Sequence, residues 1–86
     1  DVCFGGTNSA ILKPEDVLQE AIKLGVPKII LVHNHPSGDP TPSKSDFAFT
    51  ERLLQASETM GIELLDHIVI GENRFESIFY LKSKNN

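Results

Sequence analysis

The chain has 86 residues, of which 40% are hydrophobic and 23% are charged, and this composition excludes a disordered or fibrous protein. Its formal net charge of -4 lacks the positive field that non-specific nucleic-acid binding requires, so direct binding to nucleic acid is not expected. The length suits a single domain over residues 1–86, and because the sequence opens at Asp1 we expect a fragment truncated at its N-terminus.

The first half of the chain predicts two short strands, a helix and a longer strand. Short β structure is expected over residues 1–4 and 8–12. An amphipathic helix is predicted over residues 14–24, because Pro14 suits the first helical position and apolar residues follow at helical spacing. Residues 28–32 are almost continuously apolar, which predicts a central strand covered on both faces.

The second half predicts a rigid loop, a helix and a hairpin. Three prolines and a glycine exclude regular structure from residues 34–42, and a second helix is predicted over residues 43–60. Residues 63–70 and 74–79 are rich in β formers and suit a hairpin, and residues 82–86 are expected to fray. The order β, β, α, β, α, β, β predicts the α/β class, an α+β mixed sheet with helices packed on it.

No segment approaches the roughly 20 apolar residues that a membrane span needs, and no signal-peptide pattern is present. We therefore expect a cytoplasmic protein without membrane contact.

The residues with the clearest chemical meaning follow the predicted central strand. His33 and His35 are two apart, so in extended chain both imidazoles point to the same side. Seven residues separate His35 from Ser43, and Asp46 lies three residues before Phe49 on the apolar face of the predicted helix. Its carboxylate is therefore expected to point inward, toward the two histidines.

Two imidazoles and one carboxylate suit a zinc ion. Cys3 is the only cysteine, so a disulfide is excluded and His, Asp and Glu are the available ligands. Catalytic zinc takes three protein ligands and leaves a fourth position to water. Such a water becomes acidic enough to attack an amide carbonyl, so hydrolysis is the expected reaction.

Simpler interpretations exist for some of these residues. Ser43 and Asp46 also fit a capping box, in which each side chain satisfies a backbone donor at the start of a helix. Capping alone does not explain two histidines on the same side of a strand end, so Ser43 is expected both to cap the helix and to face the site. His67 is expected to be a packed histidine rather than a ligand, and Cys3 a small buried side chain.

His33, His35, Ser43 and Asp46 match the JAMM signature, H-x-H, seven residues, S-x-x-D, at every position. The surrounding text VHNHPSGDPTPS resembles the form found in the bacterial RadC family, and LLDHIVIG resembles the RadC strand that follows the helix. The resemblance covers nearly the whole chain from Gly5 onward. It implies a JAMM, or cytidine-deaminase-like, fold in which a β-sheet is flanked by helices.

The same resemblance implies roles for these residues. Zinc would be held by His33, His35 and Asp46, and Ser43 would be a catalytic residue that stabilises the developing oxyanion. JAMM (MPN+ or JAB-type) metalloproteases cleave peptide or isopeptide bonds with a metal-bound water and use a glutamate on an early strand as general base. Alignment places that glutamate just before Asp1, so we expect these residues to bind zinc better than they catalyse.

Three functions therefore remain open. The first is a zinc metallopeptidase domain that acts on a peptide or protein substrate. The second is a non-catalytic, metal-stabilised interaction module. The third is a DNA-repair accessory domain, which the RadC resemblance suggests and the acidic charge does not support.

Overall fold

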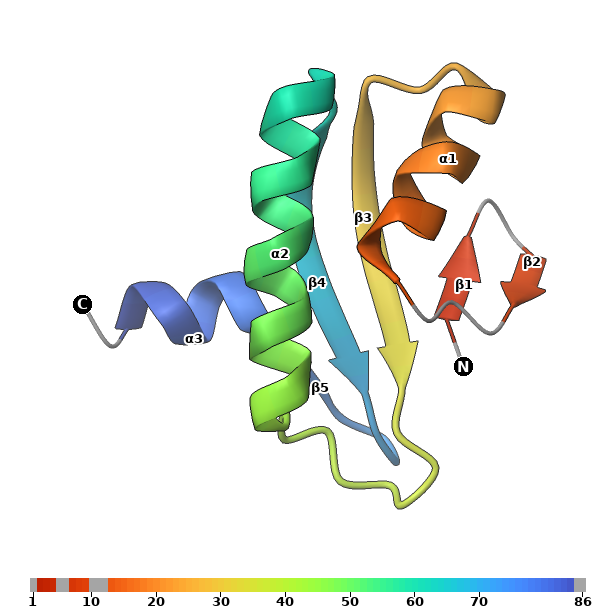
Figure 1. The fold of residues 1–86 in the computed structure, drawn as a ribbon. Coiled ribbons are helices and arrows are strands. Elements are labelled where there is room, and N and C mark those ends of the chain that lie inside the picture. The colour runs from red at the N-terminus through yellow and green to blue at the C-terminus, as the bar shows by residue number, and fades with distance from the viewer. Residues whose placement is uncertain (1, 5–6, 10–12, 85–86) are drawn as a thin grey trace.

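The protein is a mixed sheet with its main helices on one face (Figure 1), seen in a computed structural model that describes residues 2–4, 7–9 and 13–84. Side chains are described for residues 13–84. The elements in chain order are β1 (Val2–Phe4), β2 (Thr7–Ser9), α1 (Pro14–Leu24), β3 (Lys28–Asn34), α2 (Lys44–Met60), β4 (Glu63–Ile70), β5 (Phe75–Ser77) and α3 (Ile78–Lys84). The predicted α/β class, with helices packed on a mixed sheet, is confirmed.

The strand order is β2-β1-β3-β4-β5, so β3 is central as predicted. β3 and β4 are parallel, whereas the other neighbouring strands are antiparallel. A parallel pair needs a crossover, and α2 supplies it between β3 and β4. This connection returns the chain from the carboxyl end of β3, through the proline-rich loop, to the first turn of α2.

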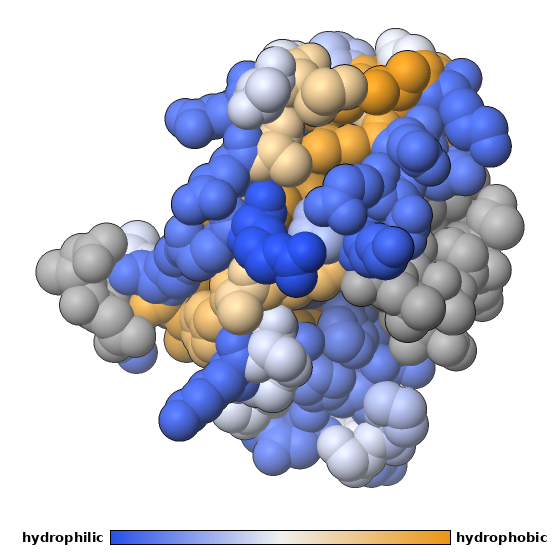
Figure 2. Space-filling view, in the orientation of Figure 1, coloured by the Kyte–Doolittle hydropathy of each residue, from blue (hydrophilic) through white to orange (hydrophobic). Residues whose placement is uncertain are grey.

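The core lies between the sheet and helices α1 and α2. It is built from the buried side chains of Val17, Leu18, Ala21, Ile29, Leu31, Leu53, Ile62 and Leu64. Figure 2 shows apolar side chains between the two helices, where a groove is lined in part by Ile22 and Met60, both about half exposed. Met60, the last residue of α2, therefore lies at the margin of the core.

The prediction that β3 is covered on both faces was wrong. Ile29 and Leu31 are buried, but Ile30 between them is 54% exposed. Alternation of this kind marks a strand with one covered face, because α1 and α2 both pack on the same side of the sheet. Apolar composition alone does not distinguish this strand from a strand buried on both faces.

The end of the chain also differs from the prediction. A strand was expected over residues 74–79 and a frayed tail over residues 82–86, but the strand ends at Ser77 and α3 extends to Lys84. Residues 10–12, at the end of the second predicted strand, and residues 85–86 lie outside the described residues, as do Asp1 and the side chain of Cys3.

Helix α3 begins where Asp66 of β4 organises its first turn. The Asp66 carboxylate accepts hydrogen bonds from the Ser77 hydroxyl at 2.7 Å and from the Phe79 backbone N–H at 3.3 Å. The Ser77 hydroxyl oxygen in turn accepts the Tyr80 backbone N–H at 3.1 Å, as an N-cap does. A short apolar run is ambiguous between strand and helix, and here the long-range cap selects the helix.

None of the helices in the described part of the chain combines the length and the apolar character needed to cross a membrane.

Candidate metal centre

The two histidines of the motif lie at the carboxyl end of β3, next to β4. His33 pairs with Val69 in the parallel register, and the backbone N–H of His35 donates to the Ile70 carbonyl at 2.9 Å. The first residue after β3 is therefore still hydrogen-bonded to β4, where the proline-rich loop begins. The two imidazole rings meet edge to face with centroids 4.8 Å apart, which brings both to one side as the spacing predicted.

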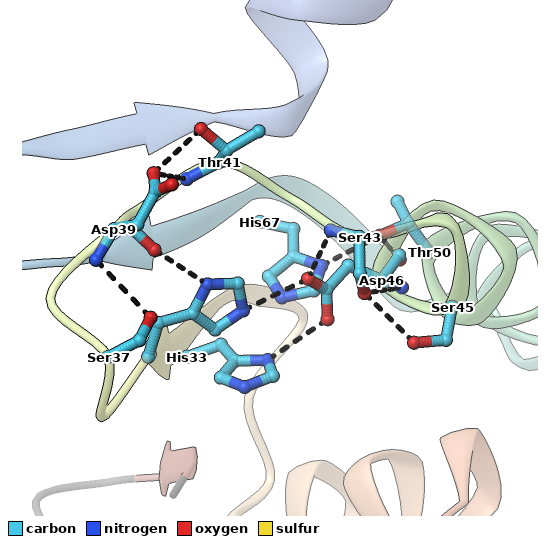
Figure 3. Close-up of polar contacts among 10 residues, drawn as sticks. His33, Ser37, Asp39, Thr41, Ser43, Ser45, Asp46, Thr50 and His67 are labelled. Atoms are coloured by element: carbon cyan, nitrogen blue, oxygen red, sulfur yellow. Dashed lines mark hydrogen bonds and ion pairs between the residues drawn. The ribbon is translucent and has the colours of Figure 1, made fainter.

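Asp46 completes the cluster from the first turn of α2 (Figure 3). The residue is buried, and its carboxylate lies next to both histidines. Oδ1 lies 3.4 Å from Nδ1 of His33, and Oδ2 lies 3.1 Å from Nε2 of His35. One ligand atom from each of the three residues lies within 4.8 Å of the others, so the cluster could hold a metal ion.

The ring of His35 is oriented by a hydrogen bond to the backbone. Its Nδ1 lies 3.0 Å from the backbone carbonyl oxygen of Asp39, and because a carbonyl only accepts, Nδ1 carries the proton. Nε2 of the same ring lies 3.1 Å from Oδ2 of Asp46, so either a proton or a metal ion belongs between these two atoms. Metal-ligating histidines are commonly oriented by such a second hydrogen bond.

The donor types of the cluster suit zinc. Each carboxylate oxygen of Asp46 lies next to a different imidazole, at 3.4 Å from His33 and at 3.1 Å from His35. Two nitrogen donors and one oxygen donor are the ligand types that zinc accepts in sites with an open position.

The protonation states favour metal binding. Burial lowers the pKa of His33 and outweighs the attraction of Asp46, so the ring is neutral at pH 7. Burial acts to raise the pKa of Asp46, but hydrogen bonds from Ser43 and the nearby histidines hold it below its ordinary value. A neutral imidazole and an ionised carboxylate are the forms that bind a metal ion, so little proton release is needed at these two ligands.

The loop that carries His35 is held by the turn after β4. The backbone N–H of Glu72 donates to the Gly38 carbonyl at 2.7 Å. A Cβ atom at position 71 would lie 2.3 Å from that carbonyl oxygen and 2.8 Å from the Pro40 nitrogen. Only glycine allows this approach, so Gly71 supports the site. The sequence indicated only a turn there.

Two buried polar residues, Thr50 and His67, lie behind the cluster. The His67 side chain is only 1% exposed, as expected of a packed histidine, and its Nδ1 contacts the Thr50 hydroxyl oxygen at 2.7 Å. Burial lowers the pKa of His67 to about 4. Among the described residues, His67 Nε2 has no hydrogen-bond partner, a condition that costs about 1–3 kcal/mol. Nothing in the sequence pattern pointed to Thr50.

Ser43 is the N-cap of α2. Its hydroxyl oxygen accepts the Asp46 backbone N–H at 3.1 Å, and its own backbone N–H donates to Asp46 Oδ2 at 2.8 Å. The capping box is therefore present, and the same carboxylate serves both the cap and the candidate metal cluster. The catalytic role expected of Ser43 remains a prediction.

We expect Ser43→Ala to lower the free energy of unfolding by about 1 kcal/mol, because one N–H at the start of α2 loses its acceptor. Zinc binding should persist, since the backbone N–H at position 43 still holds the Asp46 carboxylate. Urea unfolding and zinc titration measure the two effects. Ser45→Ala is the matched control, because within residues 13–84 the Ser45 hydroxyl is hydrogen-bonded only to that of Ser43. Equal stability of the two variants would contradict the capping role.

The comparisons with known proteins agree with this arrangement. A model of the RadC-like JAB domain family matches residues 1–85. The chain is 54% identical over 77 residues to a UPF0758 protein of Carboxydothermus hydrogenoformans, covering 90% of this chain and 34% of that protein. It is 49% identical over 83 residues to a UPF0758 protein of Desulforamulus reducens, covering 96% of this chain and 35% of that protein. The chain thus spans about a third of the length of these relatives.

Proposed function

The chain belongs to the RadC-like JAB domain family, and from this premise we propose that it is a zinc-dependent metallohydrolase domain of the JAMM type. His33, His35 and Asp46 would hold the zinc ion, and the substrate would be a peptide or isopeptide bond. When bound, zinc would acidify a water molecule and polarise the scissile carbonyl. The observation that carries the proposal is the convergence of one ligand atom from each of these three residues, all within 4.8 Å of one another.

Ser43 would donate a hydrogen bond to the substrate in the proposed reaction. Its hydroxyl oxygen already accepts the Asp46 N–H, so its own proton is available to donate. The side chain is exposed, and its contact with the Ser45 hydroxyl at 2.9 Å can be exchanged for a substrate oxygen. A donor held in this way could stabilise an oxyanion without reorganisation.

The proton transfer to the leaving amine requires a further group. The candidate ligand cluster contains a single carboxylate, Asp46, which is used as a ligand and therefore cannot also act as base. The resemblance to JAMM enzymes assigns this role to a glutamate on an early strand. A positioned general base typically contributes about 10²–10⁴-fold to the rate, so we propose that these 86 residues bind zinc but hydrolyse slowly.

The first test is the metal content. We expect about one equivalent of zinc per chain by elemental analysis after loading and desalting, because three ligands converge on one point. His35→Ala should retain little zinc, whereas Lys28→Ala, at the other end of β3, should retain as much as the unsubstituted chain. A chain that cannot be loaded with zinc, or a His35→Ala variant that binds it equally well, would exclude the proposal.

The second test separates an enzyme from a non-catalytic, metal-stabilised module. The zinc-loaded full-length protein is incubated with fluorogenic peptides and with an isopeptide formed on a lysine side chain. Zinc-dependent cleavage by the full-length protein that exceeds the rate of the 86 residues by about 10²–10⁴-fold supports the hydrolase and a base outside them. Zinc binding without cleavage by either form would favour the module.

A further inference from the structure

Thr50 of α2 and His67 of β4 lie directly behind the candidate metal cluster, and His67 also stacks on His33 of β3. Thr50 lies one helical turn after Asp46 on α2, and its hydroxyl donates to the Asp46 backbone carbonyl at 2.8 Å. His67 lies on β4, where its ring runs nearly parallel to that of His33, at 17° and with centroids 6.1 Å apart. The pair therefore contacts two of the three candidate ligands without belonging to the ligand set.

The hydrogen bonds determine which nitrogen of His67 carries the proton. The Asp46 carbonyl can only accept, so the single Thr50 hydroxyl proton is directed to it. The Thr50 oxygen must then accept from His67, and Nδ1 of the neutral ring carries the proton. His67 therefore donates to the Thr50 hydroxyl, which in turn donates to the backbone carbonyl of Asp46.

We propose that Thr50 and His67 are positioning residues, which fix the Asp46 turn and the His33 ring in the geometry that binds the metal ion. The inference rests on the proposed zinc site. A leucine or phenylalanine at position 67 would fill the same buried space without leaving a ring nitrogen unpartnered among the described residues. Packing alone therefore does not account for a histidine here, whereas orientation of the ligands does.

The chain offers a matched control for the Thr50 hydroxyl. Thr59 lies on the same helix, and its hydroxyl donates to the Gln55 carbonyl at 3.3 Å in the same i to i−4 pattern. Thr59 is exposed and is not part of the candidate metal cluster. Thr59→Val therefore removes a comparable bond to the helix backbone without affecting the metal cluster.

The experiment compares zinc affinities by competition with a chromophoric chelator. We expect Thr50→Val to weaken zinc binding by about 10- to 100-fold, as loss of a group that orients a ligand does. Thr50→Ser, which keeps the hydroxyl, should restore most of the affinity, and Thr59→Val should bind as the unsubstituted chain does. Equal affinity of Thr50→Val and the unsubstituted chain, or a Thr50→Ser variant as weak as Thr50→Val, would overturn the inference.

A second measurement does not depend on zinc or on the stability of a variant. Long-range ¹H–¹⁵N correlation spectra of the unsubstituted, metal-free chain report the tautomer of His67 directly. The inference requires the proton on Nδ1, and a proton on Nε2 would overturn it. If the unsubstituted chain binds no zinc, the proposed function fails. If it binds zinc and Thr50→Val binds equally well, only the positioning role fails.

Discussion

Asp46→Asn will lower the affinity of the chain for zinc by more than about 100-fold while α2 stays capped. Removal of groups that only orient a ligand typically costs about 10- to 100-fold, and loss of the sole charged ligand should exceed this. The asparagine side-chain oxygen can still accept the Ser43 N–H, which Asp46 accepts at 2.8 Å. The substitution therefore separates the capping role of this carboxylate from its proposed role as a metal ligand.

The matched control is Asp16→Asn. Asp16 occupies in α1 the third position after the N-cap residue Lys13, as Asp46 does after Ser43 in α2. Both variants lose one negative charge near a helix N-terminus, at a cost of about 0.3–1 kcal/mol in stability. Asp16 is not part of the candidate ligand cluster, so its variant should bind zinc normally. If both variants bind zinc alike in chelator competition, Asp46 is not a ligand.

The candidate ligands could be predicted from the sequence because local rules place them. Two-residue periodicity puts His33 and His35 on one side of the chain, and helical periodicity turns Asp46 inward. The proline-rich loop that joins β3 to α2 is short, so it restricts where Asp46 can lie relative to the two histidines. The family resemblance rests on the same residues, and the match over residues 1–85 confirms it.

The residues that support the site could not be predicted in this way. Thr50 and His67 are 17 positions apart, and their contact depends on how α2 packs on β4. The approach of Gly71 to Gly38 likewise depends on the parallel register of β3 and β4. Asp66 accepts hydrogen bonds from residues 11 and 13 positions later in the sequence and so stabilises the start of α3, where the local apolar run predicted a strand. Each of these contacts exists only after the sheet has formed.

The metal-free chain will lose stability as the pH falls from about 6.5 toward 4, and His67 will account for much of the loss. In the folded chain burial lowers the pKa of His67 from 6.5 to about 4, so the unfolded chain binds a proton at higher pH than the folded chain does. The stability that the neutral ring contributes is therefore complete above pH 6.5 and decreases through this window. The difference corresponds to up to about 3 kcal/mol.

The charged groups around His67 do not reverse this direction. Burial is the largest cause and lowers the pKa of His67, as His33 and His35 also do, and these effects outweigh Asp46 and Asp66, which raise it. Burial also lowers the pKa of His33, so it adds to the effect in the same direction. The pKa of Asp46 lies below its ordinary value, so its contribution is lost only at lower pH.

His67→Asn isolates the contribution of this ring, because an amide N–H can donate to Thr50 in place of Nδ1 and does not titrate. Urea unfolding with a chelator present, at several pH values between 7 and 4.5, gives the free energy of unfolding of each form. The variant should be less stable than the unsubstituted chain at pH 7, since a smaller side chain leaves a cavity. Its stability should nevertheless fall less with pH, so that the two curves converge toward pH 4.5. Parallel curves would show that folding does not lower the pKa of His67, and the buried ring would then not be the cause of the loss of stability.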